Sequence, residues 1–172
     1  MRRLVSAAAA IAVAVATTLA AQSRPDFSGS WVVDVEKTMA AQGRSVGMSG
    51  SGPSFTITQD ANALVITTPG GEKITYRFDG SKVTNPVLPA ATRRGASPTS
   101  DLPSPGTQEI YASVWQSSKL VTTKSGRGAN GPTLATETRW LEGEWMVTET
   151  TRKTPSGETT SRMYWKRVKR PA

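Results

Sequence analysis

The sequence predicts an all-β fold, a single antiparallel up-and-down barrel of about eight to ten strands. Apolar and polar residues alternate with a period of two along most of the chain. Short clusters rich in Gly, Pro, Asn, Asp or Ser separate the alternating runs, which is typical of strands joined by hairpins. Helical periodicity is almost absent. A meander of this kind hides its strand edges most simply by closing into a barrel, and a two-sheet sandwich is the alternative.

The individual elements follow from this alternation. Strands are expected at Gly29–Val35, Ser54–Gln59, Ala63–Thr68, Glu72–Asp79, Gln108–Gln116, Lys119–Lys124, Thr133–Leu141, Glu144–Lys153 and Gly157–Val168. The turns between neighbours are Asp60–Asn62, Pro69–Gly71, Asp79–Ser81, Glu142–Gly143 and Pro155–Gly157, which contain the residues that tight turns prefer. One short helix is expected from Glu36 to Gln42, because Gly43 is a typical helix stop.

The N-terminal segment has the pattern of a secretory signal peptide over residues 1–20. Two arginines after Met1 are followed by the apolar, Ala-rich run Leu4–Ala16 and by small residues suited to cleavage. An uncleaved membrane anchor is the alternative, but the run is shorter than the about 20 residues of a spanning helix. We therefore expect cleavage after Ala20 and one mature domain over residues 21–172, in the bacterial periplasm or secreted.

Two longer connections interrupt the strands. Arg44–Pro53 is rich in Gly and Ser, and Asn85–Gly106 (the 85–106 loop) carries five prolines together with Ser and Thr. A connection of this length inside one domain is either mobile or functional. The Pro and Ser content favours mobility, because such a segment buries little apolar surface.

The composition excludes much enzyme chemistry. Neither histidine nor cysteine occurs, so disulfides, Cys/His metal sites and histidine-dependent catalysis are ruled out. Gly43–Gly47 matches G-x-S-x-G, but a serine nucleophile of that kind needs a histidine. Gly126–Gly131 matches G-x-G-x-x-G, but a strand pattern follows where a nucleotide site needs a helix, so we interpret it as a hairpin loop. We expect no catalysis, no metal and no cofactor.

Several segments resemble exported bacterial proteins with a lipocalin-like (calycin) barrel, most of them without an assigned function. They are Pro25–Thr38, Ile57–Asp60, Thr75–Gly80, Glu137–Trp140 and Met163–Lys166. The sharpest element is Gly29-Ser30-Trp31, which is similar to the G-x-W in the first strand of lipocalins. The resemblance implies that Trp31 closes the narrow end of the barrel and that an arginine of the last strand, Arg162 or Arg167, stacks across it.

A barrel of about eight strands is either filled by its own side chains or holds one small ligand. The aromatic side chains suit both roles, as core or as the lining of an apolar pocket. Our candidate ligand-binding residues are Trp31, Tyr76, Phe78, Trp115, Trp140, Trp145, Glu149, Arg162 and Trp165. We therefore expect a non-enzymatic barrel that binds a small apolar or amphipathic molecule.

Glu137 and Glu149 are the candidates for a catalytic carboxylate pair. A two-residue turn at Glu142–Gly143 predicts Trp140 opposite Trp145, and this register places the two glutamates on opposite sides of the sheet. A glycosidase needs both carboxyl groups on one side, so the pair is excluded. Glu149 would lie either inside, paired with an arginine or a ligand cation, or near an open mouth in water.

Basic residues gather near the C-terminus, at Arg152, Lys153, Arg162, Lys166, Arg167, Lys169 and Arg170. No nucleic-acid-binding motif accompanies them, so nucleic acid is not an expected partner. The alternative function is therefore that of an envelope-interaction protein, whose basic surface contacts anionic lipid or polysaccharide. A solvated face is the simplest role for these charges.

Overall fold

The computed structural model describes residues 24–42, 54–86, 108–128, 131–154 and 157–168. These residues form ten strands and one helix. In chain order they are β1 (Gly29–Val33), α1 (Val35–Gln42), β2 (Ser54–Gln59), β3 (Ala63–Thr67), β4 (Lys73–Arg77), β5 (Val83–Pro86), β6 (Gln108–Gln116), β7 (Lys119–Gly128), β8 (Gly131–Glu142), β9 (Trp145–Thr154) and β10 (Gly157–Arg167).

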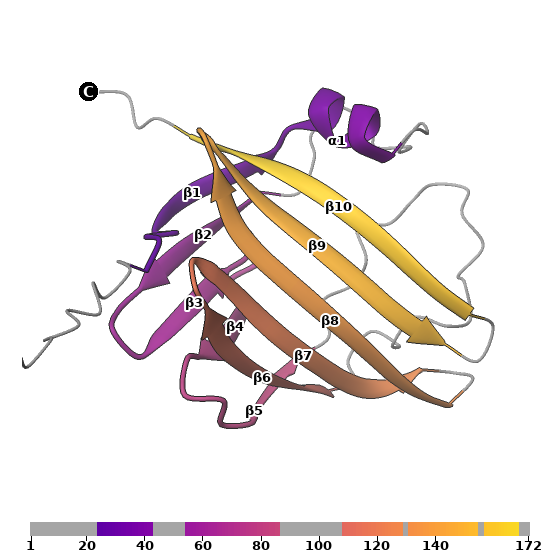
Figure 1. Ribbon diagram of the computed structural model, residues 1–172. Coiled ribbons are helices and arrows are strands. Elements are labelled where there is room, and N and C mark those ends of the chain that lie inside the picture. Colours follow the sequence, from indigo (N-terminus) through magenta and orange to yellow (C-terminus); the bar gives the residue numbers. More distant parts are fainter. Residues whose placement is uncertain (1–23, 43–53, 87–107, 129–130, 155–156, 169–172) are drawn as a thin grey trace, which may run out of the picture.

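The ten strands form one antiparallel sheet in which neighbours in the chain lie side by side (Figure 1). The order is β4-β3-β2-β1-β10-β9-β8-β7-β6-β5. The first and last strands pair with each other, with Trp31 opposite Arg167 and Val33 opposite Trp165. The predicted all-β, up-and-down antiparallel barrel is therefore confirmed.

Strands β4 and β5 stand at the two ends of this order, and local contacts join them. The buried Asn85 of β5 pairs its side-chain amide with the backbone of Thr75 in β4. The Thr75 N–H donates to Asn85 Oδ1 at 2.8 Å, and Asn85 Nδ2 donates to the Thr75 carbonyl at 2.9 Å. An isolated antiparallel bridge joins Asp79, after β4, to Val114 in β6. One amide side chain thus joins β4 to β5.

Helix α1 lies along β10, beyond the point where β1 ends (Figure 1). The Asp34 N–H donates to the Tyr164 carbonyl at 2.8 Å, which is the last main-chain bond between the two segments before the helix. The Tyr164 N–H then donates to the Thr38 hydroxyl at 3.0 Å, and Gln42 Nε2 donates to the Arg162 carbonyl at 2.8 Å. Side chains of α1 therefore form hydrogen bonds with backbone groups of β10 that lie beyond the end of β1.

Alternation predicted the ends of the expected strands to within two residues, except that β7 runs four residues beyond the expected Lys124. β2 and β6 begin and end at the expected residues, and the helix starts one residue before the expected Glu36. β5 was not predicted, because four residues ending in a proline give too short a pattern. Its last two residues, Asn85 and Pro86, fall within the predicted 85–106 loop, so that part of the prediction is wrong.

The predicted turn between β8 and β9 is also wrong. The turn residues are Gly143 and Glu144, so that Trp140 lies opposite Val147 and Trp145 lies opposite Glu142. Gly143 has a φ of +61°, and a two-residue hairpin turn takes such a glycine readily at its first central position. The β7–β8 connection is a hairpin as expected, but the predicted loop at Gly126–Gly131 is too long, because its residues 126–128 belong to β7 and Gly128 lies opposite Gly131.

Several predictions fall on residues that lie outside the described part of the chain. They concern the signal peptide (1–20), the G-x-S-x-G match (43–47), most of the Gly/Ser connection (44–53) and positions 87–106 of the 85–106 loop. Within the described ranges, no helix is both long enough and apolar enough to cross a membrane.

Candidate functional site

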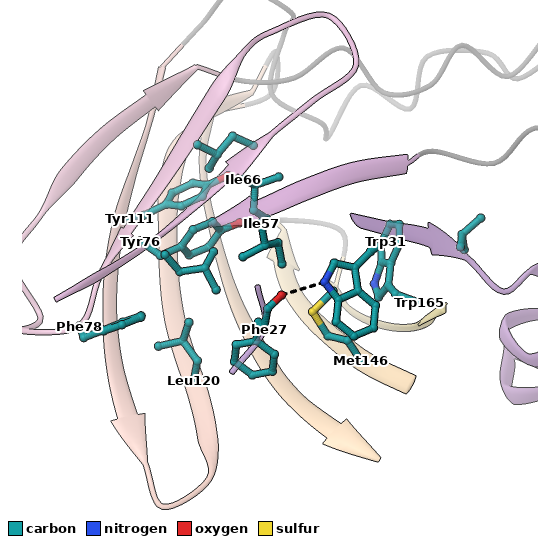
Figure 2. Close-up of a cluster of buried hydrophobic side chains, with 13 residues drawn as sticks. Phe27, Trp31, Ile57, Ile66, Tyr76, Phe78, Tyr111, Leu120, Met146 and Trp165 are labelled. Atoms are coloured by element: carbon teal, nitrogen blue, oxygen red, sulfur yellow. Dashed lines mark hydrogen bonds between the residues drawn. The ribbon is translucent and has the colours of Figure 1, made fainter. Parts of the chain in front are cut away.

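A cluster of buried apolar side chains fills one end and one wall of the barrel interior (Figure 2). Its buried members are Phe27, Trp31, Val33, Ile57, Leu64, Ile66, Ile74, Tyr76, Phe78, Tyr111, Leu120, Met146 and Trp165. Figure 2 shows Phe27, Trp31 and Met146 together at one end, with Ile57 and Ile66 farther along beside the tyrosines. Most of the apolar wall comes from β1 to β4, because their alternate residues face inward.

Trp31 is buried in the apolar cluster, with Arg167 over its ring. Its ring is 1% exposed, and its Nε1 donates to the Phe27 carbonyl at 2.8 Å. The Arg167 guanidinium carbon lies 4.8 Å from the centre of the Trp31 ring. Of the two arginines that the resemblance allowed, Arg167 is therefore the one that stacks on Trp31, whereas Arg162 faces outward.

Polar side chains occupy the inward positions of β6 to β9, away from the Trp31 end. In antiparallel pairs opposite residues share a face, so the ladders identify this set. It comprises Glu109, Ser113, Thr122, Lys124, Thr133, Glu137, Arg139, Thr148, Thr150 and Arg152. The interior therefore has an apolar wall from β1 to β4 and a polar wall from β6 to β9.

Glu137 lies at the centre of a buried ionic network. Its Oε2 accepts a hydrogen bond from Lys124 Nζ at 2.6 Å, and its Oε1 accepts one from Arg139 Nη2 at 2.9 Å. Burial alone would raise the pKa of Glu137, but Lys124 and then Arg139 hold that pKa below its ordinary value. Although burial by itself lowers the pKa of Lys124, the Glu137 carboxylate raises it overall. All three groups are therefore charged at neutral pH.

Two tyrosines cover the cations of this network. The rings of Tyr76 and Tyr111 lie 5.3 Å apart, Lys124 Nζ is 4.7 Å from the Tyr111 ring centre and the Arg139 guanidinium carbon is 4.9 Å from that of Tyr76. Burial raises the pKa of the Tyr111 phenol, so it stays protonated and donates to Glu109 Oε2 at 3.1 Å. Cation–π contacts of this kind stabilise buried charges by about 2 kcal/mol or more when desolvated.

Several donors on the inner wall have no hydrogen-bond partner among the described residues. They are Arg139 Nε and Nη1, Arg152 Nη1 and Trp115 Nε1, and the Thr133 hydroxyl is likewise unpartnered. Arg139 as a residue is only 3% exposed. Four of these five atoms can only donate hydrogen bonds, so they call for acceptors.

The inner wall is open to solvent along the first half of β10. Met163, Thr150 and Arg152 are half-buried, and Thr159 and Ser161 are exposed although they face inward. Along this half of β10, only β9 pairs with it among the described strands. Solvent therefore reaches the inner face of the sheet at this part of β10.

The nine candidate ligand-binding residues divide between the two faces of the sheet. Inside are Trp31, Tyr76, Phe78, Trp115 and Trp165, all in or against the apolar cluster. Outside are Trp140, Trp145, Glu149 and Arg162, which occupy alternate or paired positions on the other face of β8, β9 and β10. A ligand-binding role for any of the nine stays a prediction, and only the first group lies in the interior.

The outer group forms a polar and aromatic surface of its own. Arg162 Nε donates to Glu149 Oε2 at 2.9 Å, and its guanidinium carbon lies 5.6 Å from the Trp140 ring centre. Trp145 Nε1 donates to Asp34 Oδ2 at 3.1 Å, and Lys37 Nζ lies over the Trp145 ring at 3.7 Å. Glu149 is thus paired with an arginine, but on the outside of the barrel.

Glu137 and Glu149 lie on opposite faces, as predicted, because Glu137 pairs with Thr150 and Glu149 pairs with Thr138. The two carboxylates therefore cannot act on one substrate. Within the described ranges, no group of three or more acidic, histidine or cysteine side chains is placed to hold a metal ion.

The basic residues near the C-terminus do not all share a face. Arg152 faces inward, Arg162 is paired with Glu149 on the outside, and Lys153 lies 3.6 Å from Glu158. Lys169 and Arg170 lie outside the described residues. The envelope-interaction alternative stays a prediction.

Sequence reasoning missed Lys124, Arg139 and Arg152 as interior residues. The signal was present in β8, where Glu137 and Arg139 are two residues apart and must share a face. Two opposite charges on one strand face can pair with each other, and such a pair is suited to burial. Alternation does not say which face is the inner one.

Comparisons with known proteins identify no family. No family model matches the chain, and no curated protein matches it. Solved structures that it resembles include a secretary abundant heat soluble protein from Ramazzottius varieornatus (10% identity, 83% of this chain and 95% of that chain, TM-score 0.46). Another is zebrafish ileal bile acid-binding protein complexed with cholic acid (14% identity, 83% of this chain and 98% of that chain, TM-score 0.49). A third is a mutant of the fluorescent protein UnaG (16% identity, 83% of this chain and 96% of that chain, TM-score 0.47).

Proposed function

We propose that this barrel binds a small amphipathic molecule in its interior, with an anionic group of the molecule on Arg139. The observation that carries the proposal is the buried Arg139 guanidinium, whose Nε and Nη1 have no partner among the described residues. The apolar part of the molecule would lie against the wall that includes Ile57 and Ile66. The two-sided interior matches a ligand with one polar end and one apolar body.

Among the described residues, no acceptor is hydrogen-bonded to Arg139 Nε or Nη1. Glu137 already accepts from both Arg139 and Lys124, and Glu109 accepts from Tyr111. A buried donor without a partner costs about 1 to 3 kcal/mol, and more when it is charged. A carboxylate or a similar anion restores this free energy through charge-assisted hydrogen bonds, which are stronger than neutral ones. A trapped water is the competing acceptor.

The proposal includes export and the absence of catalysis. The signal-peptide pattern of residues 1–20 supports delivery to the periplasm or the medium. N-terminal sequencing of the mature protein from a bacterial host should begin at Ala21. Retention of the leader in the cytoplasm would contradict this part of the proposal.

A headgroup comparison tests the binding site. Parinaric acid, a fluorescent fatty acid, and its methyl ester have the same apolar body and differ in charge. We expect the purified protein to bind the acid at micromolar concentration and the ester about tenfold more weakly, as the loss of one charged hydrogen bond predicts. Arg139→Gln should remove the difference between acid and ester.

Arg127→Gln is the control, because Arg127 is an exposed arginine on the outer face of the neighbouring strand β7. It should bind both probes as the unsubstituted protein does. Equal binding of acid and ester, unchanged by Arg139→Gln, would indicate a trapped water and overturn the anion site. Failure of both probes to bind would overturn the proposed function itself.

A further inference from the structure

Arg152 and Thr133 lie next to each other on the inner face near the β7–β8 hairpin. Arg152 is opposite Ala135, and Thr133 is two residues from Ala135 on the same strand. The two are therefore diagonal neighbours across β8 and β9, whose Cα atoms are typically about 7 to 8 Å apart. Arg152 is half-buried, and Thr133 is 6% exposed.

Both side chains have an enclosed polar atom without a partner among the described residues. These atoms are Arg152 Nη1 and the Thr133 hydroxyl oxygen. Of the nearby acids, Glu137 binds Lys124 and Arg139, and Glu109 Oε2 accepts from Tyr111. The inner-face positions of β6 to β9 carry three cations, Lys124, Arg139 and Arg152, against two acids, Glu109 and Glu137. One positive charge on this wall is therefore uncompensated.

The unpartnered atoms of Arg152 and Arg139 belong to different levels of the barrel. Arg139 is opposite Thr148 on β9, and Arg152 is four residues farther along that strand. At about 3.3 Å per residue, the two backbone levels are about 13 Å apart. Glu137 lies on the level between them, opposite Thr150, and its carboxylate is bound to Arg139. A ligand group on Arg139 therefore leaves Arg152 without an acceptor.

We infer that Arg152 and Thr133 form a second polar subsite, so that the molecule bound in the barrel has two separated acceptor groups. The inference rests on the proposed function, since it assigns a second end to the same ligand. One acidic group would lie on Arg139, and a second acidic or hydroxyl-bearing group would lie near the open side at Arg152. The ligand class is that of elongated molecules with a polar group at each end and an apolar middle.

Displacement of bound parinaric acid measures this directly. The competitors are dodecanedioate, with a carboxylate at each end, dodecanoate, with one, and butanedioate, which is too short to reach both arginines. We expect dodecanedioate to compete about tenfold better than dodecanoate, which corresponds to one additional charged hydrogen bond of about 1.4 kcal/mol. Butanedioate should compete more weakly than either.

Arg152→Gln should remove the advantage of dodecanedioate and leave the affinity for dodecanoate unchanged. Thr133→Val keeps the shape of the side chain, removes its hydroxyl and should reduce the advantage in part. Arg127→Gln is the control, because Arg127 is an exposed arginine on the other face of β7 near the same hairpin. Unfolding midpoints of all variants in urea show whether each one is folded.

The outcomes separate this inference from the function on which it rests. Equal competition by dodecanedioate and dodecanoate, or an advantage that survives Arg152→Gln, would overturn the second subsite while leaving the site at Arg139 standing. Failure of parinaric acid to bind the unsubstituted protein would overturn the proposed function and with it the second subsite.

Discussion

Replacing Glu137 by glutamine should be among the most damaging single changes in this protein. The substitution keeps the shape of the side chain and removes the charge that Lys124 and Arg139 share. The two cations are 2.6 and 2.9 Å from the Glu137 oxygens, and the three side chains are between 4% and 12% exposed. Removing one partner of a buried ion pair typically costs about 3 to 5 kcal/mol, because the remaining charge is left without compensation. In Glu137→Gln two cations lose their counter-ion, so the expected loss of stability is near 5 kcal/mol, the upper end of this range.

Glu149→Gln is the matched control for this experiment. Glu149 also pairs with an arginine on the neighbouring strand, but its side chain and that of Arg162 are 33% and 42% exposed. An exposed pair contributes about 0 to 1 kcal/mol, so the control should lose less than about 1 kcal/mol. Both free energies of unfolding can be measured by urea denaturation followed through tryptophan emission. Losses that agree within about 0.5 kcal/mol would refute the argument that burial separates the two pairs.

The same variant tests the link between stability and binding. In the unsubstituted protein Glu137 is the counter-ion of Arg139, and in Glu137→Gln a bound carboxylate can take that place. We expect Glu137→Gln to bind parinaric acid more tightly than the unsubstituted protein, and the acid to raise its unfolding midpoint more. Weaker binding by the variant would show that Glu137 positions Arg139 for the ligand instead of competing with it.

Three further predictions concern the same fold. Folding lowers the pKa of Glu137, so its charged form stabilises the folded state when the pH is above the ordinary pKa of 4.5. The free energy of unfolding should therefore fall as the pH drops below 4.5. In Glu137→Gln this fall should be less steep. Asn85→Ala leaves the N–H and carbonyl of Thr75 unpaired, so the free energy of unfolding should fall by about 2 to 6 kcal/mol. Hydrogen exchange of the Thr75 amide should become faster. Unchanged exchange would show that the Asn85 side chain is not what joins β4 to β5. Arg167→Gln removes an exposed cation from the Trp31 ring and should cost only about 0.5 to 1 kcal/mol in urea denaturation, and a loss above about 2 kcal/mol would contradict a stacking role.

The strand order could be predicted from the sequence where tight turns join neighbouring strands. Turn residues separate the alternating runs, and a hairpin leaves little choice of partner. The closing pair of β1 with β10 also followed, since Gly29–Trp31 and the last strand have the features of first and last barrel strands. β5 was missed because Val83–Pro86 is too short to alternate. Backbone pairing with β6 places β5 in the sheet, and the Asn85 side chain links it to β4, a tertiary contact that no local pattern encodes.

The predicted register of β8 and β9 was wrong because the turn was placed one residue too early. Both Glu142–Gly143 and Gly143–Glu144 contain the glycine that the turn needs, and the two choices differ by two residues in the pairing. Because side chains alternate with a period of two, that error preserved every assignment to a face. The separation of Glu137 from Glu149 therefore survived a wrong register.

The assignment of faces to inside and outside is where sequence reasoning reached its limit, and β8 shows why. One face of this strand carries Leu134 and Trp140, and the other carries Glu137 and Arg139. By hydrophobicity the first face should be buried, yet Leu134 is 45% exposed and Arg139 only 3%. Turning the more apolar face toward solvent costs free energy, and burying two charges costs more. Local pattern and global fold usually agree, and the places where they conflict are expected at functional sites. The inverted face of β8 therefore supports a ligand site at Arg139 independently of its unpartnered nitrogens.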